Sequence, residues 1–233
     1  MTPVALTRSC FQDKFAVPRQ PGLTRNAWAD LVILPPFNRE DAFRGLETCS
    51  HLWLTFQFHE AVRADWRPVV RPPRLGGNRK VGVFASRSPF RPNSLGLSVV
   101  RNEGLTRWDG ELVLRIRDHD LIEGTPILDI KPYLPFADSV PEARVGWAGE
   151  EPPDRLTVSF STEAEAQLAA LPEERYPDLK GLIEDVTSYD PRPSFRRGRQ
   201  DEDRVYGAHL YDLNIRFRFD MVGVVILTVC YTA

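Results

Sequence analysis

Apolar and polar residues alternate with a period of two along much of this 233-residue chain. The alternation covers residues 52–58, 112–117, 156–161 and 215–220. A period of two is typical of β-strands that bury one face and expose the other. Long helical patterns do not alternate with these segments, so the sequence disfavours a doubly wound parallel sheet. We therefore expect a mainly β protein.

Helical patterns are few and lie in the second half of the chain. Thr162-x-x-Glu165 has the form of a capping box before a helix over residues 164–171, and the apolar spacing of residues 179–186 predicts a second helix. The polar and proline-rich stretch Gly149–Pro153 indicates a boundary between domains. We expect a β-barrel-like domain over residues 1–150 and a smaller α+β domain over residues 151–233.

The formal net charge of −2 conceals a strong asymmetry. Residues 63–101 contain nine basic side chains against one acid, Asp65, whereas residues 150–190 contain eleven acids and three bases. Clustered arginine is typical of proteins that bind a polyanion. The alternative is that these charges are spread over different faces of the fold.

Cysteine content and hydropathy limit the kind of protein further. Three cysteines without a CxxC spacing argue against a zinc site and indicate a reducing compartment. The apolar run 221–230 is far shorter than the roughly 20 residues that span a bilayer, and the N-terminus lacks a signal pattern. We expect a cytoplasmic protein that does not bind a membrane.

The most unusual segment combines arginine with proline and glycine. It comprises Arg71–Asn78 and Val81–Leu97, which lie between stretches that resemble strands. Proline and glycine fix a backbone path, and arginines on that path present planar groups to phosphate, carboxylate or an aromatic base. The alternative is a rigid connector with a solvated surface. Neither GxGxxG nor GxxxxGK[ST] is present, so a common nucleotide-binding loop is not predicted.

Four other segments accompany this one: Pro18–Gly22, Gly45–Leu54, Phe58–Glu60 and Glu123–Tyr133. Together, and in their order along the chain, the five segments resemble the TrmO (TsaA-like) family, whose members methylate adenosine 37 of tRNA with S-adenosylmethionine. The resemblance implies a β-barrel-like fold for the first domain and a homodimer with the cofactor near the subunit interface.

A site for S-adenosylmethionine must hold an adenine, a carboxylate and an amine, and must leave the methyl group open to its acceptor. Backbone groups of glycine- and proline-rich loops can bind the adenine, and an arginine can pair with the carboxylate. By resemblance, the cofactor contacts fall on Pro18, Arg19, Gln20, His59, Glu60, Arg87, Leu97, Glu123, Gly124, Thr125 and Pro126.

The resemblance also implies the acceptor, which is N6 of threonylcarbamoyladenosine at position 37 of tRNA. Its nitrogen lone pair is delocalised, so a base that removes the N–H proton would assist the transfer. His59, Glu60 and Asp129 are candidates for this base, and the sequence does not choose between them. His59-Glu60 and His119-Asp120 lack a metal-ligand spacing, so we expect no metal site.

Arg71, Arg74 and Arg91 are candidates for contacts with the anticodon stem-loop of tRNA, because they lie on the rigid loop and a small cofactor does not need all of them. Two alternative functions remain open. One is a non-catalytic RNA-binding module, which would have no affinity for the cofactor. The other is a methyltransferase of the same fold that acts on another substrate.

Overall fold

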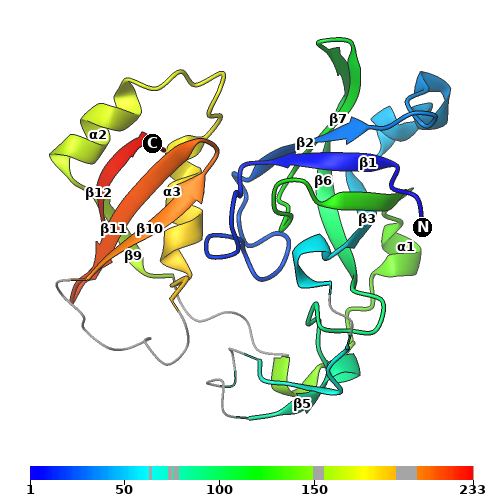
Figure 1. Cartoon of the computed structure of the whole chain (residues 1–233), viewed down its shortest axis with the longest axis horizontal. Coiled ribbons are helices and arrows are strands. Elements are labelled where there is room, and N and C mark those ends of the chain that lie inside the picture. Colours follow the sequence, from blue (N-terminus) through cyan, green and yellow to red (C-terminus); the bar gives the residue numbers. More distant parts are fainter. Residues whose placement is uncertain (63–64, 73–74, 76–78, 149–154, 193–203, 233) are drawn as a thin grey trace.

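The computed structural model describes residues 1–62, 65–72, 75, 79–148, 155–192 and 204–232. Strands predominate, which confirms the prediction of a mainly β protein (Figure 1). The strands are β1 (Ala5–Ser9), β2 (Trp28–Ile33), β3 (His51–Gln57), β4 (Val69–Val70), β5 (Val81–Gly82), β6 (Leu95–Trp108), β7 (Glu111–Arg117), β8 (Pro126–Pro132), β9 (Thr157–Phe160), β10 (Val205–Leu210), β11 (Leu213–Phe219) and β12 (Gly223–Tyr231). The α-helices are α1 (Pro135–Asp138), α2 (Thr162–Ala169) and α3 (Leu179–Ser188).

Six strands form a sheet that closes on itself in the order β1-β2-β7-β6-β3-β8. We call it the closed sheet. The predicted alternation appears directly in β3, where Leu52, Leu54 and Phe56 are buried inside the closed sheet. Gly96 of β6 lies opposite Phe56, and a methyl group at this glycine would overlap the Phe56 ring. The absence of a side chain at position 96 therefore allows the ring to fill this end of the core.

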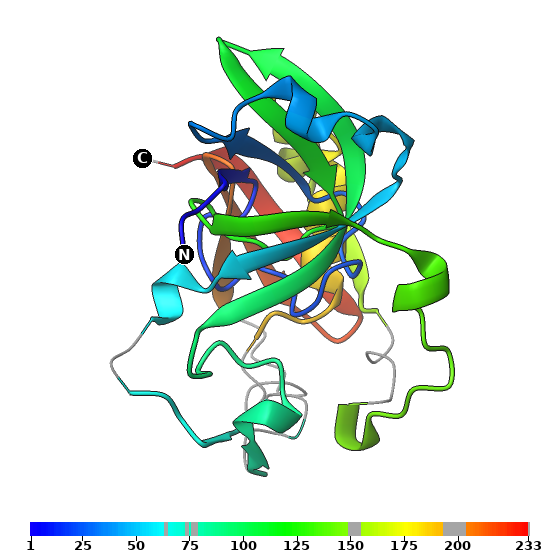
Figure 2. The same ribbon diagram turned by 90° about the vertical axis from the view of Figure 1, so that its right-hand side faces the viewer.

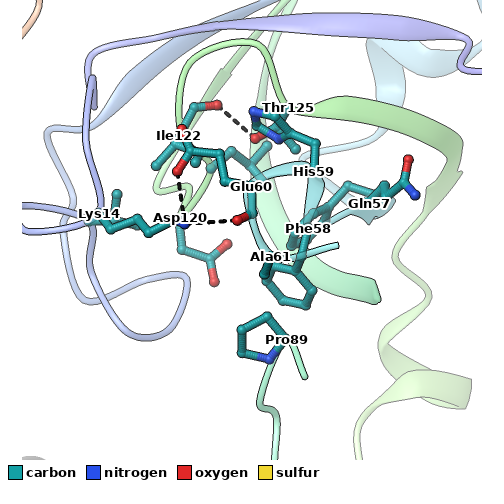
Figure 3. Close-up of a pocket in the computed structure, with 13 residues that line it drawn as sticks. Lys14, Gln57, Phe58, His59, Glu60, Ala61, Pro89, Asp120, Ile122 and Thr125 are labelled. Carbon is teal, nitrogen blue, oxygen red and sulfur yellow. Dashed lines mark hydrogen bonds and ion pairs between the residues drawn. The ribbon is translucent and has the colours of Figure 1, made fainter. Parts of the chain in front are cut away.

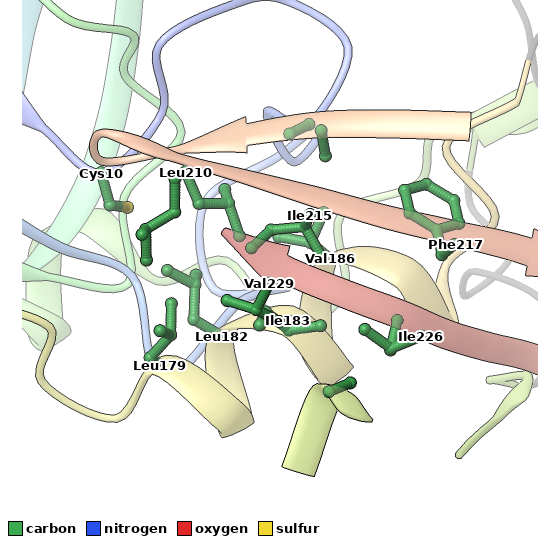
Figure 4. Close-up of a cluster of buried hydrophobic side chains, with 14 of the residues drawn as sticks. Cys10, Leu179, Leu182, Ile183, Val186, Leu210, Ile215, Phe217, Ile226 and Val229 are labelled. Atoms are coloured by element: carbon green, nitrogen blue, oxygen red, sulfur yellow. The ribbon is translucent and has the colours of Figure 1, made fainter. Parts of the chain in front are cut away.

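A second sheet has the order β10-β11-β12-β9, with β9 parallel to β12. Apolar side chains of α3 and of this sheet form one core, among them Leu182, Ile183, Ile215 and Phe217 (Figure 4). The helix predicted over residues 179–186 is α3, so the apolar spacing identified it correctly.

Helix α2 begins one residue earlier than the proposed capping box implied. Ser161 is its N-cap, since the Ser161 hydroxyl accepts a hydrogen bond from the Ala164 amide at 3.0 Å. Thr162 is the first helical residue, so the interpretation of Thr162 as the cap is wrong. Serine and threonine are both good caps, and the sequence alone did not decide between two adjacent hydroxyls.

Each sheet has its own core, but residues from the N-terminal half of the chain contribute to the core of the second sheet. Cys10, Phe11, Ala16 and Ala27 lie in the connection between β1 and β2 of the closed sheet, but they are buried in the core of the second sheet. The Tyr211 amide also donates to the Cys10 carbonyl at 2.7 Å. The boundary predicted at Gly149–Pro153 lies outside the described residues.

Residues 65–72, 75 and 79–94, which include the described part of the arginine-rich segment outside β6, form an arm that extends away from the closed sheet around the short β4–β5 pair (Figures 1 and 2). Trp66 and Phe84 pack on each other with ring centroids 6.1 Å apart, and Trp147 donates to the Ala85 carbonyl at 3.2 Å. Within the described ranges, no helix is long and apolar enough to cross a membrane.

Candidate functional site

A cavity of about 190 Å³ lies at one end of the closed sheet, where β3 ends and where β6 and β8 begin. The residues that follow β3 form one wall, and the residues that precede β8 form another (Figure 3). Its lining comprises Lys14, Val17, Phe56, Gln57, Phe58, His59, Glu60, Ala61, Pro89, Asp120, Leu121, Ile122 and Thr125.

His59 and Glu60 lie in a single 3-10 turn, His59–Ala61, directly after β3. Glu60 forms an ion pair with Lys14, whose ammonium nitrogen is 3.1 Å from Glu60 Oε2. Nδ1 of His59 is buried and has no hydrogen-bond partner among the described residues. A buried polar atom without a partner at the edge of a cavity fits a site that is completed by a bound molecule.

The segment Glu123–Pro126 forms the turn that leads into β8. The side chain of Thr125 donates to the Ile122 carbonyl at 2.7 Å, and a Cβ on Gly124 would lie 3.9 Å from Nε2 of His59. Glu123 turns to β1 instead, where its Oε2 accepts from the Ser9 amide at 2.6 Å. The structure thus brings His59, Glu60 and Thr125 together at the cavity, and Glu123 supports the turn.

Gln20 and Arg87 meet although 67 residues separate them in sequence. The Arg87 guanidinium donates to Oε1 of Gln20 at 2.5 Å, and Gln20 in turn donates to the Arg19 carbonyl at 2.5 Å. Arg87 also lies close enough to the cavity residue Asp120 to lower the pKa of that carboxyl group. Two of the predicted cofactor segments therefore meet beside the cavity.

Leu97 and Asp129 lie elsewhere. Both are register partners of Thr55 on the central strand β3, and both are exposed on the outer face of the closed sheet. The carboxylate of Asp129 is 3.3 Å from the ammonium group of Lys131. Neither Leu97 nor Asp129 lines the cavity.

The three arginines proposed to contact tRNA have different positions. Arg71 is exposed on the arm. Arg91 is half-buried and donates to the carbonyls of Ser86 and Ser88 at 3.1 and 3.4 Å, so it also holds the loop in shape. Arg74 lies outside the described residues.

In the sequence, Asp120 stands out only as half of a possible metal pair with His119. In the structure, its carboxylate lines the cavity and accepts a hydrogen bond from the hydroxyl of Ser98 at 2.6 Å. Burial raises the pKa of Asp120 to about 6, against the opposing effects of the Ser98 hydrogen bond and the Arg87 charge. A lone aspartate gave no signal in sequence, because its burial depends on β6, more than twenty residues away.

No group of three His, Cys, Asp or Glu side chains that could hold a metal ion occurs in the part of the chain that the structure describes. His119 is fully buried instead, with its Nε2 3.8 Å from the sulfur atom of Cys10. The pair His119-Asp120 is therefore split between the protein core and the cavity.

Comparisons with known proteins agree over nearly the whole chain. The family model of the tRNA-methyltransferase O N-terminal domain matches residues 6–139, and the model of the TrmO C-terminal domain matches residues 153–231. A tRNA (adenine(37)-N6)-methyltransferase of Escherichia coli is 46% identical over 220 residues, which cover 94% of this chain and 93% of that protein.

A putative S-adenosylmethionine-dependent methyltransferase of Pseudomonas aeruginosa is 45% identical over 219 residues, or 94% of this chain and 92% of that protein. The crystal structure of TrmO from the same organism superposes with a TM-score of 0.80 at 38% identity, and the match covers 99% of this chain and 96% of that one. The predicted family is thereby confirmed: this chain belongs to the tRNA-methyltransferase O (TrmO) family.

Proposed function

We propose that this protein transfers the methyl group of S-adenosylmethionine to N6 of adenosine 37 in tRNA, and that the acceptor carries the threonylcarbamoyl group. The names of the Escherichia coli and Pseudomonas aeruginosa relatives support the reaction and the methyl donor. The threonylcarbamoyl group is the finer part of the proposal and follows from the family resemblance.

The observation that carries the proposal is the convergence of distant segments on one cavity. His59 and Glu60 after β3 and Thr125 before β8 line the cavity, and the bonded pair Gln20–Arg87, from two further loops, lies beside it. The family resemblance implies a cofactor contact for each of these segments. Residues that serve unrelated structural roles would have no reason to gather at the same end of the closed sheet.

The chemistry of these groups suits S-adenosylmethionine. The guanidinium of Arg87 can pair with the carboxylate of the cofactor. The buried Nδ1 of His59 has no hydrogen-bond partner among the described residues, and a bound ligand could provide one. When bound, the cofactor supplies a methyl group on a positively charged sulfur atom. The protein's own part is to hold donor and acceptor in line, which alone accounts for a large share of such a rate enhancement.

The remaining parts of the proposal concern the assembly. The closed sheet would be the β-barrel-like cofactor-binding domain over residues 1–150, and residues 151–233 the smaller α+β domain. The arm would hold the anticodon stem-loop through Arg71, Arg74 and Arg91. A cytoplasmic homodimer completes the proposal, and the exposed position of Leu97 outside the cavity fits a cofactor contact made across the interface of two copies.

Transfer of a labelled methyl group from S-adenosylmethionine to purified tRNA tests the proposal. Two tRNA preparations are compared, one with threonylcarbamoyladenosine and one from cells that lack this modification. Label in the modified tRNA alone is the expected result. Label in both would mean that another nucleoside is the acceptor, and failure to bind S-adenosylmethionine would favour a non-catalytic RNA-binding module.

A further inference from the structure

We infer that Asp120 is the general base of the reaction, and that Ser98 positions its carboxylate. The inference rests on the proposed function, because it concerns the acceptor nitrogen of the same methyl transfer. The sequence alone offered His59, Glu60 and Asp129 for this role.

The position of Asp120 is fixed from two sides. The backbone places it in the short connection between β7 and β8, next to Leu121 and Ile122, which also line the cavity. The Ser98 hydroxyl, from the buried face of β6, holds Oδ1 at 2.6 Å. This leaves Oδ2 for a molecule in the cavity, and Figure 3 shows the carboxylate directed between Ala61 and Pro89.

The other carboxylates near the site are already engaged. Glu60 is paired with Lys14 at 3.1 Å, and Glu123 accepts the Ser9 amide at 2.6 Å. Asp129 lies on the outer face of the closed sheet beside Lys131. The cavity lining contains two carboxylates, Glu60 and Asp120. Of these, Glu60 has an ion-pair partner and Asp120 has none among the described residues.

The surroundings of Asp120 suit a base that works near neutral pH. The charged and titratable groups around it are Arg87 on the arm, His59 and Glu60 after β3, and Lys14 before β2. Burial raises its pKa to about 6, so at pH 7 the carboxylate is mostly ionised but still accepts a proton readily. An exposed carboxylate with an ordinary pKa would be a much weaker base.

The N6–H bond of the acceptor breaks, and its proton moves to Oδ2 of Asp120. The nitrogen electron pair forms the new N–C bond to the methyl group, while the electron pair of the broken C–S bond stays on sulfur, which becomes a neutral thioether. The protonated Asp120 then releases its proton to water once the products leave, and no other reactant is needed.

The first experiment compares Asp120→Asn with the wild type and with Asp41→Asn, a matched change at an exposed carboxylate between β2 and β3. Asparagine keeps the size of the side chain and a hydrogen-bond acceptor for Ser98 but does not take up the proton. We expect kcat to fall by about 100- to 10,000-fold in D120N. Binding of S-adenosylmethionine, measured by calorimetry, should remain unchanged, and D41N should behave as the wild type.

The second experiment tests Ser98 through the pH profile. In the wild type, log kcat/KM should rise with a slope of one up to about pH 6 and then level off, because kcat/KM reports the pKa of the free enzyme. The Ser98 hydrogen bond favours the ionised carboxylate, so Ser98→Ala should move the inflection to higher pH and recover most of its rate above it. The pKa of Asp120 itself is measured in the free protein by carboxyl NMR, with D120N to assign the signal.

Three outcomes would overturn the inference. The first is near-normal kcat in D120N. The second is a loss of activity in D120N that a loss of cofactor affinity fully explains, which would make Asp120 a ligand of the cofactor cation. The third is an S98A profile without a shift. A wild type that binds the cofactor but labels no tRNA would instead refute the proposed function, since the NMR titration of Asp120 does not depend on turnover.

Discussion

Asp185 on helix α3 connects the second sheet to the segment that enters the closed sheet. Its Oδ2 accepts hydrogen bonds from the Arg25 amide at 2.8 Å, the Asn26 amide at 3.3 Å and Nδ2 of Asn26 at 3.1 Å. Its Oδ1 is 2.9 Å from the guanidinium of Arg155. The carboxylate is 7% exposed, whereas the Arg155 side chain is 47% exposed. We predict that the buried acceptor stabilises the protein far more than the ion pair does.

The magnitude follows from the groups that lose a partner. Asp185→Ala removes the acceptor of three N–H groups. A typical hydrogen bond contributes about 1 kcal/mol and one to a charged group contributes more, so the free energy of unfolding should fall by at least about 3 kcal/mol. For a chain of this size, this corresponds to a lower melting temperature by about 6–12 °C. Asp185→Asn keeps one oxygen for those donors and loses only the attraction to an exposed Arg155, so it should cost about 1 kcal/mol or less.

The measurement is urea denaturation followed by tryptophan fluorescence, since Trp28 lies at this junction and donates to Asp178 at 3.2 Å. Arg155→Ala is the matched control and should resemble D185N. Equal losses in D185N and D185A would refute the reasoning, because the charge and not the acceptor would then hold the junction. A loss below about 1 kcal/mol in D185A would mean that water replaces the carboxylate without cost.

Three further predictions concern single positions. Ser161→Ala removes the cap on the Ala164 amide and should lower the free energy of unfolding by about 1 kcal/mol in the same urea assay; an unchanged midpoint would contradict that role. Gly96→Ala should cost about 1–3 kcal/mol by overpacking against Phe56 and should weaken cofactor binding, which calorimetry would detect; wild-type affinity and stability would contradict it. Burial raises the pKa of Asp120 from 3.8 to about 6, so the unfolded chain releases this proton first and stability falls as the pH rises from about 4 to 6. D120N should therefore be more stable than the wild type at pH 7, by about 3 kcal/mol at most. Thermal melting of both proteins at pH 4 and pH 7 measures this difference in stability, and a difference that is no larger at pH 7 than at pH 4 would contradict the prediction.

Local pattern was sufficient to predict the elements. The period of two identified β3, β7, β9 and β11, and the apolar spacing identified α3, because one buried face per element imposes that spacing. Local pattern did not reveal that Phe11 and Ala27 would pack with the second sheet. Both belong to a segment without periodicity, and their burial depends on strands almost two hundred residues later in the chain.

Residues that the family resemblance assigned to the site were predicted more successfully than residues chosen by the chemistry of their side chains alone. His59, Glu60 and Thr125 line the cavity, as residues that share a site should. Asp129 was a reasonable base by residue type, yet the register of β8 places it on the outer face of the closed sheet beside Lys131. Residue type indicates which reactions are possible, and only the fold determines which side chains reach the same space.

The neighbours His119 and Asp120 are both buried, but the fold places them in different surroundings. His119 lies in the protein core, and Asp120 lies at the cavity. His119 packs edge-on against Phe11, and its Nδ1 accepts a hydrogen bond from the Leu121 amide at 3.2 Å. The ring therefore contributes to the packing of the core as an uncharged group. Burial lowers its pKa to about 4, which keeps it uncharged at neutral pH. Asp120 faces the cavity instead and remains ionised at a cost in stability that Ser98 only partly offsets. Within the described residues, no cation forms an ion pair with Asp120, and a neutral side chain at this position would avoid the cost in stability. A destabilising ionised carboxylate at the wall of a cavity is what we expect of a group that accepts a proton during the reaction.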